Sequence, residues 1–459
     1  MNNLTFASLA LPQALVDNLT GMGYTEMTQI QAASLPDILN GKDVIGQGKT
    51  GSGKTAAFGL GILAKLNVKR FRVQSLVLCP TRELADQVAT EIRKLGRSIH
   101  NIKVLTLCGG VPFGPQLGSL EHGAHIIVGT PGRVEEHLNK GSLKLDDLTT
   151  LVLDEADRML EMGFQPALDA IVAFAPKQRQ TLLFSATYPK QIEAMAAALM
   201  QQPQLIKVES SHSNLSISQH FFKVDANSER LQAVKRLLLA HKPVSSVVFC
   251  NTRKETQDVA DALADAGFSV LALHGDLEQR DRDQTLVRFA NKSVSVLVAT
   301  DVAARGLDID ALDAVINYQL AHDVDTHTHR IGRTGRAGSS GIACSLFSEQ
   351  DGFKIALLED LLGPIKAETL PDESVLTQAP ARPPMVSLWI DAGKRQKLRA
   401  GDILGALTAD QQLGRDHIGK ISLFDDWAYV AVRSDIVKIA LGMFNKGIKG
   451  RNIRVKQVS

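Results

Sequence analysis

The chain alternates between short, fully apolar stretches and longer amphipathic ones. Between about residue 42 and 208 the apolar stretches are SLVLC (75–79), VLTL (104–107), HIIVGT (125–130), TLVLDE (150–155) and TLLFSAT (181–187). Fully apolar strands separated by helices are typical of a parallel sheet that is covered on both faces. The pattern predicts a first α/β domain at residues 1–208.

The same alternation restarts after the polar stretch 209–218. Its apolar runs are SVVFCNT (246–252), SVLAL (269–273), SVLVATD (295–301), AVINY (314–318) and IACSLF (342–347), which predict a second α/β domain at 219–365. Residues 366–384 contain four prolines and show no periodicity. They are therefore predicted to be an extended linker.

Beyond residue 385 the pattern changes to mixed short strands and helices. VSLWI, KISLF and WAYVAV are predicted strands, and the helices DILGALTAD and DIVKIALGMF are expected to begin at the capping residues Asp402 and Asp435. The expected fold is α/β throughout the first two domains, with two tandem parallel-sheet domains followed by a small α+β domain at 385–459.

Composition limits the cellular setting. The N-terminus lacks a basic leader before an apolar stretch, and no run approaches the roughly 18 apolar residues of a membrane span, so a cytoplasmic protein without a membrane partner is expected. The four cysteines, Cys79, Cys108, Cys250 and Cys344, lie far apart, without CxxC spacing. We expect buried free thiols in a reducing compartment.

The charge is distributed unevenly along the chain. Lys plus Arg (51) nearly balances Asp plus Glu (49) over the whole sequence, which gives a net charge of +2. Residues 385–459 alone hold thirteen basic and seven acidic residues. This asymmetry predicts a contact with a polyanion in the C-terminal domain.

A glycine-rich loop supplies the first candidate chemistry. GQGKTGSGKT follows a short apolar run and precedes an amphipathic stretch, and it fits G-x-x-x-x-G-K-T with Gly48, Gly53, Lys54 and Thr55. Glycines, including Gly51, let backbone N–H groups converge on a triphosphate. Lys54 is expected to reach the β- and γ-phosphates, and the Thr55 hydroxyl to bind Mg²⁺.

An acidic pair provides the partner of this loop. TLVLDEAD places Asp154 and Glu155 directly after an apolar strand. Phosphoryl transfer to water requires a held metal ion and a group that orients the water, and we assign these roles to Asp154 and Glu155. By themselves these residues would be interpreted as a solvated acidic turn; the glycine loop favours the catalytic interpretation.

The second domain offers a charge stabiliser in HRIGRTGRAG, with Arg330, Arg333 and Arg336. An arginine presents a fixed fork of donors, so one supplied by another domain can neutralise charge that develops on the γ-phosphate. In isolation this stretch could equally be a basic turn.

These stretches resemble the DEAD-box ATP-dependent RNA helicases over about the first 360 residues. Nearly the whole ordered motif set is present: GYTEMTQIQ, PTRELA (80–85), GG (109–110), TPGR (130–133), DEAD (154–157), SAT (185–187), VFCNT (248–252), ATDVAARGLD (299–308) and HRIGRTGR (329–336). Met27 replaces a usual proline, and Gly48 a common alanine. The resemblance implies two RecA-like domains, ATP and Mg²⁺ as cofactors, and RNA as the partner.

The resemblance also assigns roles to individual residues. For ATP it implies Phe6, Tyr24, Gln31 and Asp308 beside the glycine loop, with Arg333 and Arg336 as arginine fingers. For RNA it implies Pro80, Thr81, Arg82, Gly110, Thr130, Arg133, Gln279, Arg282 and Thr300. Asp157, Ser185, Thr187 and His329 are expected to couple hydrolysis to strand separation, with ATP and RNA together favouring a closed form.

The C-terminal domain resembles a degenerate RNA-recognition motif. Alternation in VSLWID sends Leu388 and Ile390 to one face and Trp389 to the other, and Trp427 and Tyr429 share a face of the WAYV strand. Trp389 and Tyr429 are predicted to stack on bases, whereas Trp427 is left open between core and platform. Basic residues beside them are predicted to bind phosphates: Lys394, Arg395, Lys397, Arg399, Lys449 and Arg451.

Together with the two preceding domains, which we call the motor, this domain is similar to the DbpA subgroup of DEAD-box proteins. The similarity implies targeting to a hairpin of 23S ribosomal RNA in pre-ribosomal particles during large-subunit assembly. Three alternatives remain at this point: an RNA clamp or general RNA-dependent ATPase without this specificity, a DNA helicase of the same superfamily, and a C-terminal domain that binds a protein. The sequence does not indicate an oligomeric state.

Overall fold

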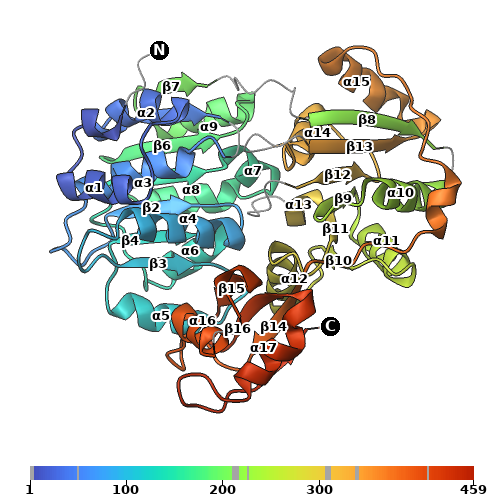
Figure 1. Cartoon of the computed structure of the whole chain (residues 1–459). Helices are drawn as coiled ribbons and strands as arrows, with labels where there is room; N and C mark the ends of the chain where they lie inside the picture. Colours follow the sequence, from blue (N-terminus) through green and yellow to red (C-terminus); the bar gives the residue numbers. More distant parts are fainter. Residues whose placement is uncertain are drawn as a thin grey trace. The chain divides into compact units, whose positions relative to one another are not determined.

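The structure is a computed structural model that describes residues 5–48, 51–208, 217–224, 227–304, 312–335, 341–410 and 413–458. The chain forms two compact units (Figure 1), one built on the N-terminal part to about residue 211 and the other on most of the remaining residues. In the part of the chain that the structure describes, no helix is both long and apolar enough to cross a membrane.

The first unit is built on one parallel sheet, with its strands in the order β3-β4-β2-β5-β6-β1-β7. Its described strands are β1 (Val44–Gln47), β2 (Ser75–Leu78), β3 (Val104–Leu107), β4 (Ile126–Gly129), β5 (Thr150–Asp154), β6 (Gln180–Ser185) and β7 (Gln204–Lys207). The central strands are apolar along most of their length because both faces are buried, as the sequence predicts.

Two hydrophobic cores lie on opposite faces of this sheet. In β5, Val152 packs into one core while Leu151 and Leu153 pack into the other. The helices that cover the faces are α1 (Gln13–Gly21), α2 (Gln29–Leu39), α3 (Lys54–Lys65), α4 (Arg82–Leu95), α5 (Phe113–Glu121), α6 (Pro131–Asn139), α7 (Ala156–Glu161), α8 (Gln165–Phe174) and α9 (Lys190–Leu199). The predicted doubly covered parallel sheet is therefore confirmed.

The second unit begins with another parallel sheet, in the order β10-β11-β9-β12-β13-β8. Its described elements are β8 (Ile217–Lys223), α10 (Asn227–His241), β9 (Ser246–Cys250), α11 (Arg253–Asp265), β10 (Val270–Leu273), α12 (Gln279–Ala290), β11 (Val296–Thr300), α13 (Asp301–Ala304), β12 (Ala314–Asn317), α14 (Val324–Ile331), β13 (Gly341–Phe347) and α15 (Gly352–Leu362). The sequence pattern did not predict β8, whose residues are partly polar.

The segment 366–384, predicted to be an extended linker, makes specific contacts with this second sheet domain. Glu368 forms a bridge to Phe222, and its carboxylate lies 2.9 Å from Nδ1 of His220. A short 3-10 turn, Glu373–Thr377, packs against α10. The segment therefore packs along the surface of the domain and is not an unattached linker.

The C-terminal domain has the order β14 (Met385–Ile390), α16 (Ala400–Thr408), β15 (Ile418–Leu423), β16 (Ala428–Arg433), α17 (Val437–Phe444) and β17 (Val455–Gln457). Its sheet is antiparallel, in the order β15-β16-β14-β17, and both helices cover one face (Figure 1). Leu388 and Ile390 are fully buried in that face, on the side that the alternation predicts.

Both predicted helix caps are wrong in detail. Asp402 lies three residues after the cap position of α16, where its carboxylate accepts a 2.9 Å hydrogen bond from the backbone N–H of Arg399. Asp435 lies in a 3-10 turn before α17 and pairs with Arg433. The prediction that all four cysteines are buried free thiols is confirmed.

Candidate nucleotide and RNA sites

The strand order of the first sheet sorts the predicted motifs into two groups. The glycine loop, the 154–155 pair and the 185–187 segment follow β1, β5 and β6, which are neighbours in the sheet. The segments 80–82, 109–110 and 130–133 follow β2, β3 and β4, which form the other end of the sheet. Because all strands are parallel, every one of these segments lies at the same edge.

The glycine loop ends at Gly53, which the Gln31 side chain contacts. Gln31 is 3% exposed; its amide Nε2 donates to the Gly53 carbonyl at 3.1 Å, and its Oε1 accepts from the Thr28 backbone N–H at 2.9 Å. Gly53 has φ +96°, and a Cβ there would lie 2.5 Å from Nε2 of Gln31. Only glycine fits both the conformation and the close approach.

Lys54 and Thr55 open helix α3 directly after this loop. Lys54 is 7% exposed, and its ammonium donates to the Gly48 carbonyl. Gly51 also has a positive φ, of +81°. The buried hydroxyl of Ser52 has no hydrogen-bond partner among the described residues. A loop with left-handed glycines and an unsatisfied donor beside a lysine suits a bound anion.

Asp154 ends β5 as a 3% exposed carboxylate. Burial, with a smaller contribution from neighbouring Glu155, raises its pKa to about 7 against the opposing charge of Lys54. Glu155 follows in a left-handed conformation, with φ +52°, and lies 3.3 Å from the guanidinium of buried Arg158. A strained non-glycine residue at this position is typical of a functional site.

The structure brings three of the predicted coupling residues together. One carboxylate oxygen of Asp157 accepts hydrogen bonds at 2.9 Å from both the backbone N–H and the hydroxyl of Thr187. The Asp157 backbone N–H in turn donates to the Ser185 hydroxyl at 3.3 Å. Asp157 therefore connects the segment after β5 to the segment at the end of β6.

The aromatic residues predicted for the adenine side also lie near each other. The rings of Phe6 and Tyr24 have centroids 6.4 Å apart in an edge-to-face arrangement. The Tyr24 hydroxyl donates to Glu91 at 2.9 Å, and burial together with this carboxylate raises its pKa to about 12.

At the other end of the sheet, side chains hold the predicted RNA-facing loops. The Thr81 hydroxyl caps α4, and Thr130 stands before α6, with its hydroxyl accepting from Gly109 N–H at 3.5 Å. Arg133 donates two 3.0 Å hydrogen bonds to the Val111 carbonyl, beside left-handed Gly110. Pro80 is buried and Arg82 half-buried.

A buried histidine that sequence reasoning missed supports this group. His137 is fully buried, and its ring stacks on Phe113 with a centroid distance of 4.1 Å. It shares a hydrogen bond with Gln116, which donates to the Cys108 carbonyl at 2.9 Å. The only sequence signal is a histidine on the buried face of an amphipathic helix.

In the second sheet domain, Arg330 is a buried structural group. It is 2% exposed, and its guanidinium pairs with Asp301 through two hydrogen bonds of 2.6 and 2.8 Å. It also donates to Asn251 at 2.8 Å and to the Gln319 carbonyl at 2.7 Å. Arg330 is one of the three arginines that the sequence suggests as charge stabilisers, but in the structure it connects the ends of β9, β11 and β12.

The neighbouring predicted residues have different settings. Arg333 is 6% exposed, and His329 is half-buried on α14. Arg336 and Asp308 lie outside the described residues. Thr300, 8% exposed, ends β11, and Arg282 donates to the Ala303 carbonyl at 2.9 Å. Gln279, which opens α12, donates to Asp283 at 2.8 Å.

Two basic loops meet on the C-terminal domain. We call them the basic loops: residues 391–399 and 446–454. Asp391 N–H donates to the Arg454 carbonyl at 2.9 Å, and Arg451 donates to the Gln396 carbonyl at 3.0 Å. The side chains of Lys394, Lys397 and Arg399 are exposed and form no ion pair with any residue that the structure describes.

Acidic residues far away in the sequence partly neutralise this surface. Lys449 pairs with Asp402 at 3.2 Å, Arg395 pairs with Asp426 at 3.1 Å, and Lys446 pairs with Asp410. The sequence of the two loops alone therefore suggests a higher positive charge than this surface has once the ion pairs are formed. Lys394, Lys397 and Arg399 remain the best placed of the predicted set for phosphate contacts.

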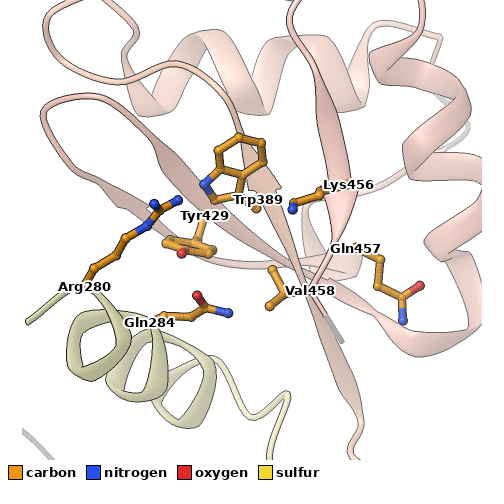
Figure 2. A pocket seen from close by; sticks show the side chains of 7 residues that line it. All are labelled: Arg280, Gln284, Trp389, Tyr429, Lys456, Gln457 and Val458. Carbon is orange, nitrogen blue, oxygen red and sulfur yellow. The ribbon is translucent and has the colours of Figure 1, made fainter. Parts of the chain in front are cut away.

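Trp389 and Tyr429 are partners in the register of β14 and β16, on the face opposite the core. Figure 2 shows them facing helix α12, from which Arg280 and Gln284 project towards them. Trp389 is half-buried, but Tyr429 is only 2% exposed. The helix thus covers Tyr429, which the sequence predicts to be an open base platform.

The environment of Trp427 answers a question that the sequence left open. Its ring stacks on Phe424 at 5.8 Å, and the Arg280 guanidinium lies 5.2 Å from its centroid. Trp427 is half-buried and is not part of the domain core. Sequence reasoning missed Arg280 and Gln284, although their spacing of four residues places them on one face of α12.

Three family profiles match successive parts of the chain. The family profile described as DEAD/DEAH box helicase matches residues 28–195, and the helicase conserved C-terminal domain matches 229–338. The DbpA RNA binding domain matches residues 387–457.

Relatives align with the chain over nearly its whole length. It is 52% identical to the ATP-dependent RNA helicase DbpA of Escherichia coli, with 97% of each chain covered. It is 35% identical to the protein of that name from Bacillus subtilis, with 99% of each covered. Among solved structures, Dbp5 of S. cerevisiae bound to RNA and ADP BeF3 matches with a TM-score of 0.72 and 28% identity, over 82% of this chain and 100% of that one.

Proposed function

The chain belongs to the DEAD-box RNA helicases, in the group with the DbpA RNA-binding domain, and we propose that this domain directs it to large-subunit ribosomal RNA during subunit assembly. The enzyme is an ATP-dependent RNA helicase. The resemblance to the DbpA subgroup supplies the choice of RNA, and a 23S ribosomal RNA hairpin within pre-ribosomal particles is the proposed target. Because bacterial ribosomes are assembled in the cytoplasm, we propose that the protein acts there.

One observation carries the targeting part of the proposal. The basic loops converge on the C-terminal domain and present Lys394, Lys397 and Arg399 without ion pairs to the described residues. Motor contacts in this family go mostly to phosphate and 2′-OH groups, which carry no sequence information. Two basic loops that converge on a separate domain bind phosphates only where a folded RNA places them, so this domain can select an RNA by its shape while the helicase domains remain unselective.

The ATP site is proposed on the contacts of the first sheet domain. Gly48, Gly51 and Gly53 would cradle the phosphates, Lys54 would bind the β- and γ-phosphates, and Gln31 would read the adenine edge while it holds the loop. Glu155 would orient the attacking water, and Arg333 and Arg336 would neutralise charge on the γ-phosphate. Since these arginines belong to the second sheet domain, hydrolysis would require both domains to bind one nucleotide.

Magnesium fits the donors present here. Asp154 and Thr55 offer hard oxygen ligands, and a divalent cation beside the buried Asp154 would keep that carboxylate ionised despite its raised pKa. When bound, the ion neutralises phosphate charge. Among the residues described, no group of three or more His, Cys, Asp or Glu side chains could hold a metal. The remaining ligands would therefore come from phosphate and water.

The proposal is tested by RNA-stimulated ATP hydrolysis of the full chain. The variant K394A/K397A/R399A is compared with K420A/K438A, which removes two exposed lysines elsewhere on the same domain. We expect ribosomal RNA to stimulate the unmodified protein at far lower concentrations than unrelated RNA. The basic-loop variant should lose this preference, and the control should keep it. Equal stimulation of all three proteins by both RNAs would leave a general RNA-dependent ATPase or clamp without ribosomal specificity.

A further inference from the structure

Helices α5 and α6 are joined by a chain of hydrogen bonds between buried side chains. Gln116 of α5 is 9% exposed, and His137 of α6 is fully buried. Nδ1 of His137 lies 2.8 Å from the hydroxyl of Ser142, and its Nε2 lies 3.2 Å from Oε1 of Gln116. The Gln116 amide nitrogen donates to the Cys108 carbonyl at 2.9 Å. The chain of hydrogen bonds therefore runs from the loop after α6 to the residue directly before Gly109.

The available donors determine the direction of these hydrogen bonds. The Ser142 hydroxyl has one proton, and it lies near both Nδ1 and the carbonyl of His137. That carbonyl already accepts from the backbone N–H groups of Ser142 and Leu143, at 3.0 and 3.2 Å. We therefore assign the hydroxyl proton to the bond with Nδ1, which leaves the ring proton on Nε2, where it is donated to Gln116. Both ring nitrogens of a neutral histidine then have a partner.

The surroundings of His137 favour this neutral ring. Burial lowers the pKa of His137, Arg133 and Lys140 lower it further, and Glu136 opposes them. The ring therefore remains neutral at neutral pH, and it keeps one donor nitrogen and one acceptor nitrogen.

The neutral ring fixes the orientation of the Gln116 amide. If the amide were reversed, its NH₂ group would face the Nε2–H of His137, and its oxygen would face the Cys108 carbonyl. Both contacts would then be repulsive, so only one orientation satisfies the two neighbours. In this orientation the amide holds the backbone directly before the Gly109–Gly110 turn.

Two further contacts hold the same turn against α6. The His137 ring stacks on Phe113, with a centroid distance of 4.1 Å. Arg133 donates two 3.0 Å hydrogen bonds to the Val111 carbonyl. Gly110, with φ +74°, is therefore held by α6 from the residues before it and from the residues after it.

We propose that His137 and Gln116 are positioning residues for the binding of RNA by the motor. Both side chains are buried, so they act through the groups predicted to contact RNA, which are Gly110, Thr130 and Arg133. These groups belong to the two segments that the hydrogen bonds join, and RNA phosphates can bind to both segments at once only while their spacing is fixed. The inference rests on the proposed function, and it deepens that function by naming residues that set RNA affinity without contacting RNA.

Two substitutions separate the hydrogen bonds of His137 from its packing. His137→Asn and His137→Gln both remove the ring and its stacking on Phe113. The shorter asparagine amide occupies the region of Nδ1 and keeps only the contact with Ser142. The glutamine amide extends towards the position of Nε2 and can donate to Gln116. We therefore expect the glutamine variant to retain the RNA affinity that the asparagine variant loses.

The measurement is ATP hydrolysis by the full-length protein at increasing concentrations of a ribosomal RNA fragment and, separately, of an unrelated RNA. His137→Asn should raise the RNA concentration for half-maximal stimulation about tenfold, whereas His137→Gln should raise it less than about threefold. The kcat at saturating RNA should stay close to that of the unmodified protein. The factor should be the same for both RNAs, because motor contacts to phosphate and 2′-OH groups carry no sequence information.

Further variants test whether these residues act as one chain. Gln116→Met removes the amide and should match His137→Asn, and the double variant should be no weaker than either single variant. Ser142→Ala removes only a hydroxyl, at a half-buried position outside the helices, and should raise the RNA concentration about threefold. It keeps the test decisive if a buried substitution prevents folding, which urea unfolding of each variant would reveal. The matched control His122→Gln changes an exposed histidine at the end of α5 and should leave the RNA response unchanged.

Equal RNA responses of His137→Asn and His137→Gln would overturn the inference and leave the proposed function intact, because His137 would then act by packing alone. Additive effects of Gln116→Met and His137→Asn, or an unchanged response of Ser142→Ala, would overturn it as well. Absence of stimulation of the unmodified protein by both RNAs would instead overturn the proposed function.

Discussion

The Arg330 guanidinium and the Asp301 carboxylate form a buried two-point pair, with hydrogen bonds of 2.6 and 2.8 Å. Arg330 belongs to the motif predicted to supply arginine fingers, and Asp301 directly follows Thr300, which is predicted to face RNA. Arg330 belongs to α14 and Asp301 to α13, so these two hydrogen bonds hold the two helices together. The pair therefore connects the segment predicted to face RNA with the segment predicted to face the nucleotide in the second sheet domain.

Arg330→Ala should destabilise this domain strongly. Removal of one partner of a buried ion pair leaves an uncompensated charge and costs about 3–5 kcal/mol in free energy of unfolding. Urea unfolding followed by circular dichroism would measure the loss. Arg253→Ala is the matched control, because Arg253 pairs with Asp276 while both side chains are more than half exposed. The control should lose no more than about 1 kcal/mol. Similar losses for both variants would contradict a structural role for Arg330.

Gly53→Ala should weaken ATP binding. The new Cβ would lie 2.5 Å from Nε2 of Gln31 and 2.8 Å from the Thr28 hydroxyl, in a conformation with φ +96°. The left-handed conformation alone costs alanine about 1–2 kcal/mol, and the clash adds to it. We expect at least a roughly tenfold rise in the Kd for a fluorescent ATP analogue.

Gly141→Ala provides the control for this prediction. Gly141 also has a positive φ, of +67°, but a Cβ there meets nothing within 4 Å. The control should bear the conformational cost in stability and bind ATP normally. Unchanged ATP affinity in the Gly53 variant would show that the contact with Gln31 does not support the loop.

Most of the fold, and the predicted ATP site, could be recognised from local sequence patterns. Apolar strands such as 150–154 are visible because burial on both faces requires continuous apolar residues. The glycine loop is visible because its chemistry depends on spacing within one segment. Strand β8, by contrast, is partly exposed and pairs with the distant β13, so its own sequence does not reveal it.

The C-terminal domain shows what tertiary contacts add. Alternation predicts the correct face for Trp389 and Tyr429, because the period of a strand is local. It gives no information about α12, which covers Tyr429 from another domain. The pairing of Lys449 with Asp402 is equally invisible, since the two residues come from separate elements that the fold brings together.

His327 should make the second sheet domain sensitive to acid. It is 1% exposed, its Nε2 lies 3.1 Å from Gln219, and burial, with a smaller effect of Arg330, lowers its pKa to about 4. The unfolded chain takes up a proton below about pH 6.5, whereas the folded domain keeps the ring neutral. Stability is therefore lost as the pH falls from about 6.5 to 4, by up to about 3 kcal/mol.

Urea unfolding of His327→Gln between about pH 7 and 5 checks this prediction. The variant should start less stable than the unmodified protein at neutral pH and lose less stability on acidification. His322→Gln changes an exposed histidine of the same domain and should retain the original pH dependence. A pH dependence that is the same in all three proteins would assign the acid sensitivity to other groups.

The basic loops should appear in the salt dependence of RNA binding. Each lysine that neutralises a phosphate releases a counterion, so its loss lowers the slope of log affinity against log salt by about 0.7 to 0.9. K394A/K397A should therefore bind RNA more weakly at low salt and have a slope smaller by about 1.5. K420A/K438A removes the same charge from other exposed positions of the domain and should keep the original slope. Equal slopes for both double variants would mean that net charge alone attracts RNA, and that the convergence of the two loops has no specific role.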